Sequence, residues 1–197
     1  MGLFPEFSDF FIGYASYHWN PVNKYIHIIC IPMILSSSLG LMNHLGIHLP
    51  NPLIDNPLFN LNPSFLLILC ISLAYLSIDF ATGFVSTCFY FGHWLANNYL
   101  YQYCISNNLN NIHFKVALGI HIVCWIAQFI GHGFFERRAP ALLDNLLYTL
   151  VAPNFVIIEI FFELGYKKDV YEKCQKQVLK NIEEFQNKRK SAAKKTS

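Results

Sequence analysis

Four long runs of this sequence contain no charged side chain, and they limit what the chain can fold into. A helix that crosses a bilayer needs about 20 mostly apolar residues, and each run is long enough to provide one. The runs without Asp, Glu, Lys or Arg are Tyr25–Ile54, Asn56–Ile78, Phe80–Phe114 and Val116–Phe135. Only 13% of the chain is charged, against about 25% in soluble domains. The sequence therefore favours an integral membrane protein over a soluble all-helical core.

Prolines and the apolar pattern divide these runs into expected helices. We expect helices over residues 25–45, 64–79, 83–103 and 115–135, with a loop rich in Pro and Asn at 49–63. The stretch 142–166 is also apolar, but Pro153, Glu159 and Glu163 interrupt it. The predicted fold class is all-α, a multi-pass transmembrane helical bundle of about four spans. Residues 142–166 are expected to add a re-entrant or interfacial helical hairpin bent at Pro153.

Charge is segregated between the body and the C-terminal tail. From Lys167 onward the chain has ten basic and four acidic residues, whereas the rest has four basic and eight acidic. The excess of Lys and Arg places this tail in the cytosol. We expect a membrane-embedded catalytic domain over residues 1–166 and a basic cytosolic tail over 167–197, with both termini cytosolic. Nucleic-acid binding is not expected, because the tail is solvated lysine without interleaved aromatic residues.

The last four residues, Lys194-Lys195-Thr196-Ser197, look like a dilysine retrieval signal. Such a signal acts only at a cytosolic C-terminus, in agreement with the charge distribution. It predicts a protein of the endoplasmic reticulum membrane that is recognised by the retrieval machinery. The alternative is a merely lysine-rich end, since residues 188–190 are basic too.

Polar groups gather where the fourth expected helix ends, in "QFIGHGFFERRAPALLDN" (128–145). With four spans, this stretch returns to the cytosolic side, next to "SYHWNPVNKYIH" (16–27). His132 and Glu136 are four residues apart and are neighbours if the helix continues. Imidazole and carboxylate ligands at an open site suit non-haem Fe(II). The alternative is that Glu136, Arg137 and Arg138 form interfacial salt bridges, with the histidines as helix-end hydrogen-bonding groups.

The other histidines are less promising ligands. His121 and His132 share a helix face, but eleven residues of helix separate them by about 16 Å. We therefore expect His121 to line a channel or to support a ligand rather than bind the same ion. His44 and His48 form an i,i+4 pair, but the topology puts them on the opposite side of the membrane.

Two blocks carry a resemblance to a known family. "YHWNPVNKYIHIICIP" (17–32) and "WIAQFIGHGFFERRAPALLDNLLYTLVAPNFVIIEIFFELGY" (125–166) are similar to a family of multi-pass membrane proteins. Its fungal member is the 2-hydroxy fatty acid dioxygenase of phytosphingosine degradation in the endoplasmic reticulum. The resemblance covers roughly residues 10–168, weakly in the middle helices. The family's recurring histidines match His18, His27 and His132, and the resemblance implies that these three hold Fe(II).

The resemblance also implies α-oxidation of a long-chain 2-hydroxy fatty acid by O₂, with loss of the carboxyl carbon. The acyl chain would lie among the apolar helices and enter from the membrane lipid. Arg137 or Arg138 would meet the carboxylate in a bidentate contact. Glu136 would be a fourth ligand or would fix an imidazole tautomer. Asn23, Gln128 and His121 are further candidates for supporting the ligands.

Two other classes of protein compete with this hypothesis. The di-iron membrane hydroxylases and desaturases need many more histidines, including adjacent pairs, and this chain has no His-His dipeptide. That class is rejected. A non-catalytic lipid-binding or scaffold protein of the endoplasmic reticulum membrane stays open as the alternative, because a polar cluster at a helix end also serves packing and topology.

Overall fold

The computed structural model describes residues 7–140 and 147–196, and these residues are predominantly helical. The seven α-helices are α1 (Phe7–Ala15), α2 (Pro21–Met42), α3 (Pro63–Ile78), α4 (Phe80–Ser106), α5 (Asn110–Ile130), α6 (Leu147–Glu163) and α7 (Lys168–Thr196). Short 3₁₀ turns occur at Asn43–Leu45 and Pro57–Phe59, and a π-helical turn, Gly131–Glu136, continues α5. Within the described ranges the β pairing is a single bridge, Leu49 with Leu61. The all-α fold is confirmed.

Side-chain caps explain where the long helices begin. Asn20 and Asn62 each accept a backbone hydrogen bond in the first turn of α2 and α3, and each is followed by proline. Asp79 caps α4 in the same way, through Thr82 N. Proline suits the first helical position because its missing N–H would have no partner there. These caps start α2 at residue 21, four residues earlier than the charge-free run alone indicates.

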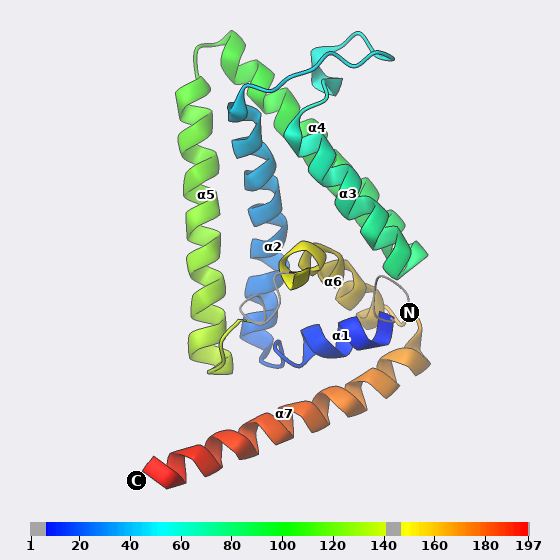
Figure 1. The fold of residues 1–197 in the computed structure, drawn as a ribbon, viewed down its shortest axis with the longest axis vertical. Coiled ribbons are helices and arrows are strands. Elements are labelled where there is room, and N and C mark those ends of the chain that lie inside the picture. The colour runs from blue at the N-terminus through cyan, green and yellow to red at the C-terminus, as the bar shows by residue number, and fades with distance from the viewer. Residues whose placement is uncertain (1–6, 141–146, 197) are drawn as a thin grey trace.

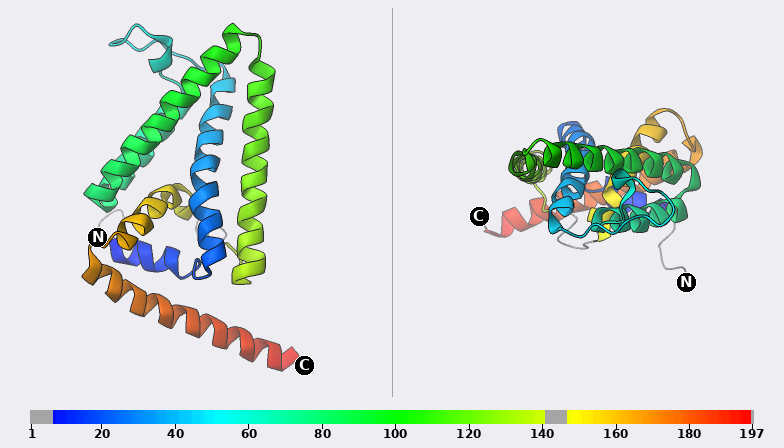
Figure 2. Two further views of the ribbon diagram at one scale, coloured as in Figure 1. Left: turned by 180° about the vertical axis from the view of Figure 1, so that it is seen from behind. Right: turned by 90° about the horizontal axis from the view of Figure 1, so that it is seen from above.

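The helices form two pairs that diverge toward one end of the molecule (Figure 1). α2 lies along α5, and α3 lies along α4. α3 and α4 approach closely at Gly83, where a Cβ atom would overlap the backbone of Tyr75. α6 and α1 occupy the space between the diverging pairs, and α7 crosses beyond α1 at the same end (Figure 1 and Figure 2).

Two helices of the described chain are long and apolar enough to cross a membrane, Pro21–Leu45 and Asn110–Glu136. α6 with α7 passes as a third only if the two helices are counted as one broken span, and α3 is a shorter apolar helix. Large apolar side chains are exposed along α5, among them Ile122, Val123 and Ile126. Such a surface suits contact with lipid. The structure thus fits a membrane protein, and the count of four spans is approximate.

The bend expected at Pro153 lies elsewhere. α6 continues through Pro153, and the chain turns by 114° between Glu163 and Lys168. Gly165 and Lys167 have positive φ in this turn, which reverses the direction of the chain. The carbonyl of Pro153 accepts a hydrogen bond from the Tyr90 hydroxyl, so a helix neighbour supports the proline.

A polar contact joins this turn to the start of α4. The Lys167 ammonium donates to the buried Asp79 carboxylate, and the Tyr166 hydroxyl donates to it as well. Burial opposes ionisation of Asp79, but the hydrogen bonds from Lys167 and Thr82 outweigh it and hold its pKa below the ordinary value. Beyond the turn, α7 buries Cys174, Val178 and Ile182 in a core shared with α1 and α6. In packing, α7 is therefore not separate from the body of the protein. The expected division into a catalytic domain (1–166) and a tail (167–197) stays a prediction about function.

Candidate metal centre

His18 lies in the turn between α1 and α2, with only 6% of its surface exposed. Its Nδ1 is 2.7 Å from the carbonyl oxygen of Tyr14, and the Tyr14 ring stacks against it at 4.1 Å between centroids. A carbonyl only accepts, so Nδ1 carries the proton and donates it. The lone pair is then on Nε2, which is buried and has no partner among the described residues.

His27 has the same arrangement one turn into α2. Its Nδ1 donates to the carbonyl of Asn23 at 2.8 Å, which leaves the Nε2 lone pair available. A metal-binding imidazole almost always donates its other N–H to a carbonyl or carboxylate, because this bond fixes the tautomer and the ring orientation. His18 and His27 therefore have the hydrogen bonding of metal ligands.

His132 comes from the π-helical turn at the end of α5. Its Nε2 is 3.1 Å from Nε2 of His27, and its Nδ1 is buried without a described partner. The π turn inserts a residue into the helix and buries both His132 and Glu136, which are 3% and 1% exposed. Gly131 permits the approach to α2, because a Cβ atom there would overlap the Asn23 amide oxygen.

One ligand atom from each of the three histidines lies within 4.8 Å of the others, and all three residues are buried. Burial, with the two nearby imidazoles, lowers the pKa of His18 well below its ordinary value. A neutral imidazole is the form that binds a metal. Three buried imidazoles whose ring nitrogens converge suit a divalent transition metal such as iron, zinc or copper. The donor set therefore fits a metal ion.

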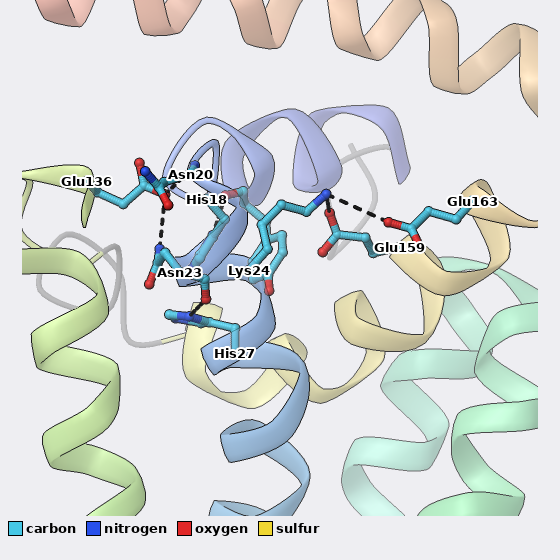
Figure 3. Close-up of polar contacts among 9 residues, drawn as sticks. His18, Asn20, Asn23, Lys24, His27, Glu136, Glu159 and Glu163 are labelled. Carbon is cyan, nitrogen blue, oxygen red and sulfur yellow. Dashed lines mark hydrogen bonds and ion pairs between the residues drawn. The ribbon is translucent and has the colours of Figure 1, made fainter.

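Glu136 lies beside this group rather than within it. Its Oε1 accepts from the backbone N–H of Asn20 at 2.9 Å and from Asn23 Nδ2 at 3.1 Å, while Oε2 is buried without a described partner (Figure 3). The carboxylate thus sits at the N-terminus of α2, where the helix dipole favours a negative charge. Asn23 connects Glu136 to His27, because its side-chain amide donates to Glu136 and its backbone carbonyl accepts from His27.

The two arginines are not among the residues that line the cavity beside the three histidines. The Arg138 guanidinium stacks on the rings of Tyr17 and Phe185, at 3.4 and 4.5 Å from their centroids. It also donates to the Ser16 carbonyl at 3.2 Å. Arg137 is exposed and has a left-handed backbone, with φ of 52°. Neither side chain lines the cavity described next.

A cavity of about 360 Å³ opens from the three histidines into the space between the helix pairs. This volume is within the range of about 300–1,000 Å³ that is typical of ligand pockets. The cavity is lined mainly by apolar and aromatic side chains, and none of its lining residues within 7–140 and 147–196 is a lysine or an arginine. It holds His18, His27 and His132 at one end and includes Ile31, Leu35, Ser38, Met42, Leu67, Ile71, Tyr75, Trp125, Gln128 and Phe129 along its walls.

His121 and Gln128 belong to the wall of this cavity. Trp125 Nε1 donates to His121 Nε2 at 3.0 Å, so the His121 proton is on Nδ1, which lies 3.1 Å from Ser37 Oγ. Both nitrogens of His121 are thereby occupied. Gln128 is 6% exposed, and its Nε2 has no partner among the described residues. Its amide nitrogen is thus a polar group of the cavity wall that the described part of the chain leaves unpaired.

Sequence reasoning did not select Tyr14, Lys24 or Glu159 as part of the site. Tyr14 supports His18 through its ring and its carbonyl, and its position four residues before His18 was the available signal. Lys24 Nζ lies 2.6 Å from Glu159 Oε1 and ties α2 to α6 (Figure 3). The partners come from regions 135 residues apart, so sequence spacing carried no sign of the ion pair.

The fold and the site define a helical membrane protein with a buried three-histidine candidate metal centre beside an apolar cavity. The family described as "2-hydroxy-palmitic acid dioxygenase Mpo1-like" matches residues 4–164, and this chain belongs to that family. It is 33% identical over 154 residues to the 2-hydroxy-palmitic acid dioxygenase MPO1 of Saccharomyces cerevisiae (strain ATCC 204508 / S288c). The alignment covers 78% of each chain. No solved structure matches this protein.

Proposed function

We propose that this protein is an Fe(II)-dependent dioxygenase that shortens 2-hydroxy fatty acids by one carbon. The observation that carries the proposal is the buried group of His18, His27 and His132, whose ring nitrogens converge at the end of an apolar cavity. Family membership and the name of the yeast relative support the same substrate class. The reaction would contribute to the degradation of phytosphingosine and other sphingolipids in the endoplasmic reticulum membrane.

The proposed reaction balances with O₂ as its sole oxidant. A 2-hydroxy acid and one O₂ give the acid one carbon shorter, CO₂ and water. The bond between C1 and C2 breaks, C1 leaves as CO₂, and C2 becomes the new carboxyl carbon. Carbon gives up four electrons in total, and one O₂ accepts four. An iron ion held by His18, His27 and His132 would supply O₂ activation and would polarise the hydroxyl and carboxylate oxygens of the substrate.

The residues around the histidines would keep this site in place. Tyr14 and Asn23 fix the tautomers of His18 and His27 through their carbonyls. Glu136 holds the π-helical turn against the start of α2, and we assign it to positioning rather than to the metal. Arg138 fixes the Tyr17–His18 turn by its stacking contacts, and the exposed Arg137 is the candidate for first contact with the substrate carboxylate.

The acyl chain would enter from the bilayer and lie in the cavity. Phe129 and Leu150 both line the cavity and are about half exposed, so they mark an apolar opening. A long-chain acid partitions into the membrane, which brings the substrate to this opening by lateral diffusion. The apolar wall would also exclude water from the reacting carbons.

The test measures iron and product together. The purified full-length protein is loaded with Fe(II), assayed for bound iron, and incubated with 2-hydroxyhexadecanoic acid and O₂. We expect about one iron per chain and release of pentadecanoic acid and CO₂. If the three histidines did not hold the iron, His132→Ala would keep both its iron and its turnover. Binding of the acid without any product would instead indicate a lipid-binding protein.

A further inference from the structure

The cavity follows α2 in regular steps away from the candidate metal centre. The residues of α2 that line it are His27, Ile31, Ile34, Leu35, Ser38 and Met42. They recur every three or four positions and therefore form one stripe along the helix. With a rise of about 1.5 Å per residue, the stripe extends about 22 Å from His27 to Met42.

The facing helices line the same length of cavity. On α5, His132 is followed along the wall by Gln128, Trp125 and His121, and the last is about 16 Å from the first. On the opposite side α3 contributes Leu67 and Ile71. The cavity therefore extends along α2.

Hydrogen bonds within the protein occupy several polar groups of this wall. The Ser38 hydroxyl donates to the Ile34 carbonyl at 2.8 Å, and the Tyr75 hydroxyl donates to the Leu150 carbonyl at 2.8 Å. Both nitrogens of His121 have partners as described above. Because these polar groups are already paired, an alkyl chain can lie against them without leaving a buried donor or acceptor unpaired.

We propose that the acyl chain of the substrate lies parallel to α2 and that Ser38 sets the accepted chain length. This inference rests on the proposed function, which puts the hydroxylated carbon C2 beside His27. Carbon–carbon bonds of about 1.5 Å that meet at about 111° advance an extended chain by about 1.25 Å per carbon. Ser38 is about 16 Å along α2 from His27, and this distance corresponds to about carbon 15 of the chain.

The small side chain of Ser38 thus leaves room for the end of a sixteen-carbon acid. Met42 lies one turn farther along α2, opposite about carbon 20. A larger residue at position 38 would block the part of the cavity that holds the last carbons of the acyl chain. It would leave the three histidines unchanged. The structure assigns Ser38 to chain-length specificity and not to chemistry.

The experiment uses Ser38→Phe in the full-length, iron-loaded protein. We measure kcat/KM for 2-hydroxydodecanoic acid and for 2-hydroxyhexadecanoic acid. We also measure Kd for both acids without O₂, from the fluorescence of Trp125 in the cavity wall. For the longer acid, kcat/KM should fall and Kd should rise by about tenfold or more, because the ring occupies the space of its terminal carbons. For the shorter acid both should change by less than about twofold.

Met33→Phe is the matched control, because Met33 is exposed on the same helix and lies outside the cavity lining. It adds an aromatic ring to α2 and should change neither kcat/KM nor Kd for either acid. Equal losses for both acids in Ser38→Phe would overturn the inference, since they would indicate a disturbed site or fold. No loss for either acid would overturn it too, by showing that the chain leaves through the opening at Phe129.

A second variant lengthens the cavity instead of blocking it. Met42→Ala removes bulk opposite about carbon 20 and should raise kcat/KM for 2-hydroxyicosanoic acid relative to 2-hydroxyhexadecanoic acid by about threefold. An unchanged ratio would contradict the proposed register even if Ser38→Phe did not fold. If the unmodified protein neither bound nor converted any of these acids, the proposed function itself would fail. If the wild type converted these acids and the variants showed no shift in chain-length preference, only the role of Ser38 would be refuted.

Discussion

Two groups of histidines lie at opposite ends of α2, and their hydrogen bonds differ. At one end, His18 and His27 donate Nδ1–H to backbone carbonyls. His18 Nε2 has no partner among the described residues, and His27 Nε2 lies 3.1 Å from His132 Nε2. At the other end, His44 Nε2 and His113 Nδ1 bond to each other at 2.8 Å.

Burial differs in the same way. The first three histidines are buried, whereas His44 and His113 are half-buried and lie against Tyr101. His48 Nε2 is paired with the Asn43 carbonyl. The same side chain is therefore left available for a metal at one end and used for packing at the other. The comparison shows that burial and the convergence of three ring nitrogens, rather than the number of histidines, distinguish the candidate metal centre from the structural cluster.

The largest expected effect comes from removing one of the three buried histidines. His18→Ala, His27→Ala and His132→Ala should each lose bound iron and lower turnover by more than about 100-fold, since even changes to the groups around a metal ligand cost 10–100-fold. His44→Ala is the control and should keep both. Iron analysis and product assays of the four variants decide the matter. Iron loss in His44→Ala would show that the two ends had been assigned wrongly.

Removal of the metal should lower the thermal stability of the protein only when the three buried histidines are intact. An ion that binds only the folded protein adds stability that rises with its concentration relative to Kd, about 2.7 kcal/mol at 100 times Kd. We expect a chelator to lower the thermal unfolding midpoint of the wild type and of His113→Ala in detergent. The same chelator should leave His132→Ala unchanged. Equal shifts in all three proteins would mean that the stabilising metal binds outside the buried histidines.

A smaller effect is expected at Glu136. Glu136→Gln keeps an oxygen that accepts from Asn20 and Asn23 but removes the charge at the start of α2. We expect iron to be retained and turnover to fall by about 10-fold, at the low end of changes to groups around metal ligands. Loss of iron from the purified variant would make Glu136 a ligand instead. Asn181→Asp, a change on α7, provides a control for altered charge near the same end of the bundle.

The far histidines should affect stability and leave chemistry unchanged. His113→Phe removes the hydrogen bond to His44, and such a bond contributes about 0.5–1.5 kcal/mol to the free energy of unfolding. We expect a small decrease in unfolding midpoint with unchanged iron content and kcat. Measurements of both on one preparation test this. A decrease in kcat at full iron occupancy would connect the far end of α2 to the reaction.

The smallest effect on chemistry is expected at the terminal lysines. Lys194→Ser with Lys195→Ser should let the protein leave the endoplasmic reticulum, at least in part, without changing iron content or kcat. Fluorescence microscopy of the tagged protein, with the tag at the N-terminus, measures the location. Full retention of the double variant would mean that these lysines are only solvated charge or that a second signal suffices.

Much of the secondary structure followed from local rules. The expected helices at 25–45, 64–79, 83–103 and 115–135 all correspond to helices of the structure, because long apolar runs bounded by proline and asparagine have few alternatives. Their ends shifted where caps such as Asn20 and Asp79 extended them. The bend of residues 142–166 was expected at Pro153, whereas α6 continues through that residue and the chain turns between Glu163 and Lys168.

The sequence by itself determined the apolar runs, the basic tail and the histidines that the family resemblance singled out. Only the tertiary structure decided how these residues meet. It placed His18, His27 and His132 within reach of one ion, turned Arg138 onto Tyr17, and set Glu136 against Asn20 and Asn23. The reason is physical: apolar runs and caps act within a few residues. A shared ligand atom or an ion pair depends on how distant helices pack, and local spacing does not encode that.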